Sequence, residues 1–200
     1  VLMDKFWSDV TPSSARNSLN VAICSIRKTL AQIWPEQEII LYNNENYCIN
    51  PNLEVMTDIE RFIYFWKKGR AIESTQGLPD ALGAYNKAMH LYRDEFMANI
   101  RFDEWCEAER DNLQEIYLFI LNRLSIYALE NKNYDACINI CTRMLAKDEC
   151  LEDIHRKLMR CYHAMGLTDL ALKQYFKCEK ALEKELNPKP SEPTRELFSK

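Results

Sequence analysis

Hydrophobic positions near the start of the chain follow a helical period. Between residues 13 and 33 they form one stripe, because positions i, i+3 and i+4 share a helix face. The stripe consists of Ala15, Leu19, Ala22, Ile23, Ile26 and Leu30. We expect Ser13 or Ser14 to cap this helix, since a hydroxyl can accept hydrogen bonds from the free N–H groups of a first turn. Trp34-Pro35 ends it, and residues 8–12 separate it from the end of an earlier helix at residues 1–7.

Two short runs of strand-forming residues follow this helix. Glu38–Tyr42 and Tyr47–Asn50 flank Asn43–Asn46, whose residue types tolerate the positive φ of a tight turn. The pattern predicts a β-hairpin directly after a helix with a polar face. Pro51-Asn52 ends the second strand.

From Thr57 onward the hydrophobic period is helical throughout. The expected helices span residues 58–72, 78–91, 102–129, 134–146, 151–165 and 167–185, with a broken piece at 93–99 and a last short turn at 194–198. We expect residues 74–79 to form a loop and Asn187–Pro190 to interrupt helicity.

Part of this helical region repeats with the tetratricopeptide period of about 34 residues. Leu124 aligns with Leu158, Asp135 with Asp169, Cys137 with Ala171, Ile138 with Leu172, Cys141 with Tyr175 and Met144 with Cys178. Ala81-Leu82-x-x-Tyr85-x-x-Ala88 is an earlier copy of the second helix. The predicted fold is mostly α: tetratricopeptide-like stacked helix pairs, with Cys137, Cys141, Ala171 and Tyr175 buried between them. A generic helical bundle is the alternative.

These patterns divide the chain into residues 1–52 and residues 53–200. With 47 % hydrophobic and 28 % charged residues, the composition is that of an ordinary globular protein. Every apolar stretch is far shorter than the roughly 18 residues of a membrane span, and residues 1–7 lack the cleavage site of a signal peptide. We therefore expect a cytoplasmic protein without membrane contact. We also expect a fragment of a longer chain, because the sequence opens without Met inside a helical stretch.

The eight cysteines lack the spacing of a metal site. They form no C-x-x-C pair, and the three histidines show no H-x3-H pattern. We expect reduced, metal-free thiols that fill small buried positions in a reducing compartment. We expect no cofactor.

The net charge of −4 opposes nucleic-acid binding, but the first long helix departs from this balance. Residues 10–35 contain no Asp or Glu and carry Arg16, Arg27 and Lys28. A helix fits the major groove of DNA, where amides and hydroxyls can read base edges, and a hairpin tip of Asn residues can reach the neighbouring backbone or minor groove. The pattern indicates a recognition helix followed by a wing. The alternative is a polar helix face that only meets water.

Ordered segments along nearly the whole chain carry a family resemblance. The first set of segments consists of Phe6-Trp7-Ser8-Asp9, Ala15-Arg16-Asn17-Ser18-Leu19, Ile26-Arg27-Lys28 and Asn46-Tyr47-Cys48-Ile49-Asn50. This set resembles the second half of a response-regulator-type winged helix. The second set of segments lies in the helical region and consists of Thr57-Asp58-Ile59-Glu60-Arg61-Phe62, Leu91-Tyr92-Arg93-Asp94-Glu95-Phe96, Trp105 with Glu109-Arg110, His155-Arg156-Lys157-Leu158-Met159, and Pro190, Thr194 and Leu197. This set resembles the bacterial transcriptional activator domain of the antibiotic regulatory protein family. Asp94 stands where that family usually has Gly, and the strands and first helix that begin its winged helix are not in this sequence.

The resemblance implies DNA contacts from the polar side of the helix at residues 13–32. By position, the expected contacts to bases come from Asn17, Ser18, Asn20, Val21 and Ser25, and the contacts to phosphates from Arg16, Arg27 and Lys28, with Asn44 at the hairpin tip. Ser25 stands where the family usually has a basic residue. We expect these 200 residues alone to bind DNA weakly.

Three function classes separate at this point. The first is a transcriptional regulator that binds double-stranded DNA and uses its helical repeats for self-dimerisation or for contact with a protein such as RNA polymerase. The second is a helical-repeat adaptor with a degenerate winged helix that does not bind DNA. The third, an enzyme, is disfavoured because the sequence contains no G-x-S-x-G, P-loop or G-x-G-x-x-G motif. We expect His155 and Arg156 to form inter-helix hydrogen bonds rather than to act in catalysis.

Overall fold

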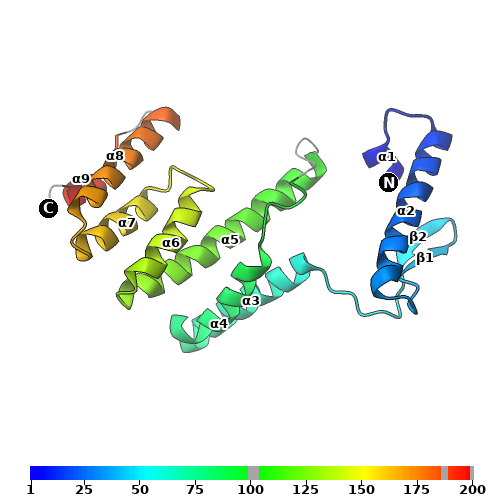
Figure 1. Ribbon diagram of the computed structural model, residues 1–200, viewed down its shortest axis with the longest axis horizontal. Coiled ribbons are helices and arrows are strands. Elements are labelled where there is room, and N and C mark those ends of the chain that lie inside the picture. The colour runs from blue at the N-terminus through cyan, green and yellow to red at the C-terminus, as the bar shows by residue number, and fades with distance from the viewer. Residues whose placement is uncertain (99–103, 186–188, 199–200) are drawn as a thin grey trace. The chain divides into compact units, whose positions relative to one another are not determined.

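The computed structural model describes residues 1–98, 104–185 and 189–198. The chain forms two compact units, Val1–Met56 and Thr57–Lys200, so the unit boundary lies four residues beyond the division expected at 52/53. Each unit has its own secondary structure (Figure 1). The candidate DNA-contacting residues all belong to the first unit.

The first unit consists of two helices and a hairpin. They are α1 (Leu2–Phe6), α2 (Pro12–Ile33), β1 (Ile40–Asn43) and β2 (Asn46–Ile49). The strands are antiparallel, with Ile40 opposite Ile49 and Asn43 opposite Asn46, so the predicted hairpin is confirmed.

The cap of α2 differs from the prediction of Ser13 or Ser14. Thr11 is the N-cap, and its hydroxyl accepts a hydrogen bond from the Ser14 N–H at 3.3 Å. Pro12 explains the shift, because proline has no N–H to satisfy and its fixed φ suits the first helical position. The cap therefore lies immediately before the proline. Trp34 is the C-cap, as the Trp34-Pro35 break predicts.

The second unit is a series of helices that pack pairwise in chain order (Figure 1). They are α3 (Asp58–Gln76), α4 (Leu78–Leu91), α5 (Glu104–Glu130), α6 (Tyr134–Leu145), α7 (Glu152–Ala164), α8 (Thr168–Glu185) and α9 (Glu192–Phe198). The pairs are α3 with α4, α5 with α6 and α7 with α8, and one continuous hydrophobic core runs from α3 to α7. The predicted fold class, mostly α with tetratricopeptide-like stacked helix pairs, is confirmed.

The connection between α3 and α4 is shorter than predicted. The expected loop at residues 74–79 is wrong, because α3 continues to Gln76 and Gly77 alone joins it to α4. Ser74 and Thr75 stay helical, and their hydroxyls donate to the Ala71 carbonyl at 2.9 and 3.0 Å. Gly77 adopts φ = 98°, a conformation that glycine reaches without steric penalty.

Four pairs of residues that align in the predicted repeat are buried in both copies. The aligned pairs Leu124/Leu158, Cys137/Ala171, Cys141/Tyr175 and Met144/Cys178 are all buried, with none more than 9 % exposed. Ala81, Tyr85 and Ala88 of the earlier copy are fully buried. The predicted core positions are therefore confirmed. The side chain of Trp105, part of the family resemblance, lies outside the described residues.

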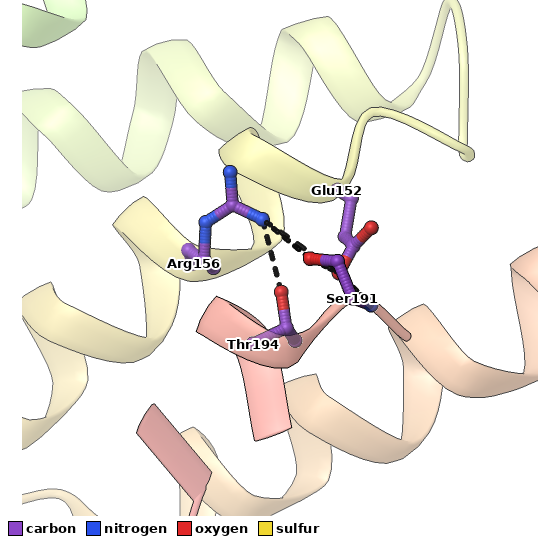
Figure 2. A network of polar contacts seen from close by, with 4 residues as sticks. All are labelled: Glu152, Arg156, Ser191 and Thr194. Carbon is purple, nitrogen blue, oxygen red and sulfur yellow. Dashed lines mark hydrogen bonds and ion pairs between the residues drawn. The ribbon is translucent and has the colours of Figure 1, made fainter. Parts of the chain in front are cut away.

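The last helix is anchored to α7 by a polar network (Figure 2). The Glu152 carboxylate accepts hydrogen bonds from the Ser191 N–H at 2.7 Å and the Ser191 hydroxyl at 2.6 Å, while Arg156 donates to the Thr194 hydroxyl at 3.0 Å. Thr194 is fully buried. Burial disfavours the charged carboxylate, but the hydrogen bonds from Ser191 and Thr194 and the charge of Arg156 outweigh it and lower the pKa of Glu152. The predicted inter-helix role of Arg156 is confirmed.

Candidate nucleic-acid interface

One side of α2 is held against the hairpin. The Arg27 guanidinium donates two hydrogen bonds to the Ile40 carbonyl, at 2.6 and 3.2 Å, and lies 5.8 Å from the centre of the Tyr47 ring. The Tyr47 hydroxyl donates to Asn20 Oδ1 at 2.9 Å. Arg27 and Asn20, both predicted to contact DNA, therefore also fix the position of the hairpin relative to the helix.

A neighbouring face of α2 is open to solvent. Asn17, Val21 and Lys28 lie within about 40° of one another around the helix axis, because each residue advances about 100°. All three are exposed, as is Ser25 on the flank of the same face, and Val21 is 70 % exposed. This face combines an amide, an apolar side chain and a cation, the groups that read an adenine edge, a thymine methyl and a phosphate.

The remaining candidates lie at the borders of this face and on the hairpin. Ser18 is half-buried on α2, and Arg16 is exposed on the border nearer the hairpin. Arg16 lines a crevice of about 430 Å³ together with Leu19, Asn20, Tyr42 and Tyr47.

The hairpin tip is a tight turn with two left-handed residues. Asn44 and Glu45 have φ values of 48° and 63°, and the Asn46 side-chain amide donates to the Asn44 carbonyl at 2.9 Å. Two central residues with positive φ match the right-handed twist of the flanking strands. Both tip side chains are exposed.

Sequence reasoning missed the roles of Glu45 and Tyr47. Glu45 places a carboxylate at the hairpin tip next to Asn44, which opposes contact with a phosphate. Tyr47 positions Asn20 across a separation of 27 residues. The Glu45 charge was visible in the sequence, whereas the Tyr47 contact depends on the packing of the hairpin against α2.

The apolar stripe of α2 is only partly covered within its own unit. Ala15 and Ile23 are buried, but Ile26 is 46 % exposed. Ile33 and Trp34 at the end of the helix are 63 % and 46 % exposed. The first unit therefore covers part of the stripe and leaves another part in contact with solvent.

All five buried thiols lie in the second unit. Cys106, Cys137, Cys141, Cys161 and Cys178 are fully buried, and burial raises the pKa of the Cys178 thiol to about 12. Within the described residues no group of three His, Cys, Asp or Glu side chains is arranged to hold a metal ion. Nor does any helix there have the length and hydrophobicity needed to cross a membrane. The metal-free state of the thiols stays a prediction.

A comparison with known protein families decides what kind of helical repeat the second unit is. The family described as the bacterial transcriptional activator domain matches residues 57–200, the whole of the second unit. The chain belongs to this family. The resemblance noted in the sequence is therefore confirmed for the activator domain, whereas the winged-helix half remains a prediction.

Two regulatory proteins are similar to most of the chain. The transcriptional regulatory protein MoaR1 of Mycobacterium tuberculosis is 22 % identical over 200 residues, which cover 100 % of this chain and 64 % of MoaR1. The regulatory protein DnrI of Streptomyces peucetius is 21 % identical over 196 residues, which cover 95 % of this chain and 72 % of DnrI. The chain thus spans about 64 % of the length of MoaR1.

Solved structures show the same fold at low sequence identity. Mycobacterium tuberculosis EmbR, solved in complex with a low-affinity phosphopeptide, superposes with a TM-score of 0.67 at 17 % identity, covering 99 % of this chain and 52 % of the EmbR chain. The C-terminal TPR-containing domain of a Plasmodium falciparum putative FK506-binding protein gives a TM-score of 0.52, also at 17 % identity, covering 72 % of this chain and 89 % of that domain. The second match supports the tetratricopeptide-like character of the activator domain.

Proposed function

We propose that this chain is the part of a bacterial, cytoplasmic transcriptional regulator that joins a winged-helix DNA-binding domain to a protein-contacting activator domain. In this proposal residues 1–52 are the second half of the winged helix, and residues 53–200 mediate self-dimerisation or contact with another protein such as RNA polymerase. Relatives named as regulatory proteins, similar along nearly the whole chain, support a regulatory rather than an enzymatic role.

The observation that carries the DNA-binding part is the acid-free, exposed face of α2 beside a hairpin. Asn17 is the most available base reader, because Asn20 already accepts a hydrogen bond from Tyr47. Lys28 and Arg16 are the most available phosphate contacts, because the Arg27 guanidinium is engaged with the Ile40 carbonyl. Val21 adds an apolar contact suited to a thymine methyl.

The test is fluorescence anisotropy of the full-length gene product on duplex DNA from upstream of its own gene. Asn17→Ala should relax sequence preference by about 1–3 kcal/mol at one base pair, because a bidentate amide–adenine contact is lost. Lys28→Ala should weaken binding to all sequences about equally, since a phosphate contact carries no sequence information. Lys67→Ala, an exposed lysine of α3, is the matched control and should leave binding unchanged.

The second candidate function is a helical-repeat adaptor with a winged helix that does not bind DNA. The net charge of −4 and the Glu45 carboxylate at the hairpin tip favour it, because both repel phosphates. Undetectable binding of both the cognate and a scrambled duplex by the wild type would support the adaptor instead.

A further inference from the structure

A groove of about 840 Å³ lies between α6, α7 and α8 in the second unit. Its apolar lining comes from Leu145 on α6, Leu158 and Tyr162 on α7, and Ala181 on α8. These side chains come from three successive helices, so the groove follows from the stacking of neighbouring helix pairs. The groove is large enough to take several side chains of a bound polypeptide.

One wall of the groove is positively charged. Lys177, Lys180 and Lys184 line it from α8 at i, i+3 and i+7, the spacing that puts side chains on one helix face. The sole carboxylate among the lining residues is Glu149, which pairs with Lys184 at 2.9 Å. Among the described residues neither Lys177 nor Lys180 forms an ion pair. The wall therefore has two cationic groups whose charge is not neutralised within the groove.

The pKa of Glu149 shows that the positive charges of the wall stabilise a nearby carboxylate. The hydrogen bond and charge of Lys184, with the more distant charges of His155 and Lys180, lower the pKa of Glu149 although its side chain is exposed. A carboxylate that a partner brings beside Lys177 and Lys180 would be attracted by the charges of these two lysines. Attraction of this kind is weak at an exposed site and gains strength where apolar contact excludes water.

The floor of the groove is held rigidly. The His155 ring is buried, with Nδ1 2.6 Å from the Gln174 amide nitrogen and Nε2 3.0 Å from the Glu149 carbonyl. These two contacts connect the start of α7 to α8 and to the loop before α7. A groove whose walls are fixed before binding loses little conformational entropy when it is occupied.

We propose that this groove binds an acidic segment of another protein. The apolar side chains of that segment would contact the floor formed by Leu145, Leu158 and Tyr162, and its carboxylates would lie beside Lys177 and Lys180. A DNA duplex offers phosphates to the lysines, but its backbone carries nothing apolar for the floor. The inference deepens the protein-contact part of the proposed function, on which it rests, and is independent of α2. Loss of DNA binding by α2 variants and loss of peptide binding by α8 variants are therefore separate outcomes.

The test measures binding of a fluorescein-labelled peptide to the 200-residue chain by fluorescence anisotropy. The peptide has about 15 residues and combines Glu and Leu. A second peptide with Gln in place of every Glu reports the contribution of charge. The double variant Lys177→Glu/Lys180→Glu should weaken binding of the acidic peptide by about tenfold, because attraction becomes repulsion at two positions. Lys67→Glu/Lys68→Glu makes the same change in net charge on exposed positions of α3 and should leave the affinity within about twofold of wild type.

A third variant tests the shape of the site without changing its charge. Ala146→Trp places a bulky side chain at an exposed lining position and should reduce peptide affinity while far-UV circular dichroism stays unchanged. The proposal is overturned if the α3 control loses as much affinity as the α8 variant, or if the Gln peptide binds as tightly as the acidic one. It is also overturned if duplex DNA displaces the peptide, or if sedimentation shows a dimer that the α8 reversal dissociates, since the occupant would then be DNA or a second copy.

Discussion

A single methyl group added at Gly69 tests how tightly the first helix pair is packed. Gly69 is buried on α3 and faces the Tyr85 ring of α4, and an ideal Cβ at this position would lie 2.5 Å from Tyr85 Cε1 and 2.6 Å from Cδ1. The ring has little freedom to move away, because Tyr85 is fully buried and its hydroxyl donates to Glu73 at 2.6 Å. Glu73 is held in turn by Arg123 of α5. Gly69→Ala must therefore displace one helix relative to the other.

The expected magnitude is the balance of two effects. Overpacking a core contact typically costs about 1–3 kcal/mol, while replacing glycine by alanine inside a helix returns about 0.8–1.0 kcal/mol. Gly69→Ala should therefore lower the free energy of unfolding by as much as about 2 kcal/mol. Gly83→Ala on α4 is the matched control, because no atom lies within 4 Å of its ideal Cβ, and it should raise stability by about 0.5–1 kcal/mol.

The assay is urea denaturation of both variants and the wild type, followed by far-UV circular dichroism. The two variants should move the midpoint in opposite directions. In a double-mutant cycle, Gly69→Ala combined with Tyr85→Leu should cost less than the sum of the single changes, because the smaller side chain leaves room for the added methyl group. If Gly69→Ala proves as stable as Gly83→Ala, the close packing of α3 on α4 is refuted.

Three further changes test the repeat and the docking of α9. Ala171→Leu should lower the free energy of unfolding by about 1–3 kcal/mol through overpacking, and an unchanged denaturation midpoint would contradict the repeat register. Lys132→Gly should raise it by about 0.5–1 kcal/mol, because Lys132 adopts φ = 58°, and a decrease would contradict the left-handed turn. Because the folded-state pKa of Glu152 is lowered, its stabilising effect is complete above the ordinary value of 4.5 and is lost as pH falls below it. Glu152→Gln should therefore reduce stability at neutral pH and flatten this acid-side loss in denaturation measured from pH 7 to pH 3; parallel pH profiles for variant and wild type would refute this role.

The repeat shows what could be predicted from the sequence. Its period identified the buried positions, because burial follows the hydrophobic pattern. The expected helix ends also located both turns, but not the backbone conformation within them. The turn between α5 and α6 and the turn between α7 and α8 place their left-handed residues at Lys132 and Gly166, which occupy the same position of the repeat. Matching hydrogen bonds close both turns, from Asn133 to Ala128 and from Leu167 to Tyr162, each at 2.8 Å. Glycine indicates a left-handed position from the sequence, whereas the lysine at 132 does not.

The candidate interface was predictable as a surface but not in its internal contacts. The absence of acidic residues on α2 and the hairpin after it follow directly from the residue types. The engagement of Arg27 with the Ile40 carbonyl and of Asn20 with Tyr47 depends on how two separately predicted elements pack. The cap was misplaced for a local reason, because Pro12 moved it to Thr11.

The salt dependence of DNA affinity tests the central claim most directly. The full-length gene product should bind duplex DNA from upstream of its own gene. The logarithm of its binding constant should fall linearly with the logarithm of the salt concentration, with a slope of about −0.9 for each phosphate contact. Lys28→Ala should reduce that slope by about one contact, while Lys67→Ala should leave it unchanged. An affinity for duplex DNA that is undetectable at low salt, or a slope that Lys28→Ala does not change, would contradict the assignment of α2 as the DNA-contacting helix.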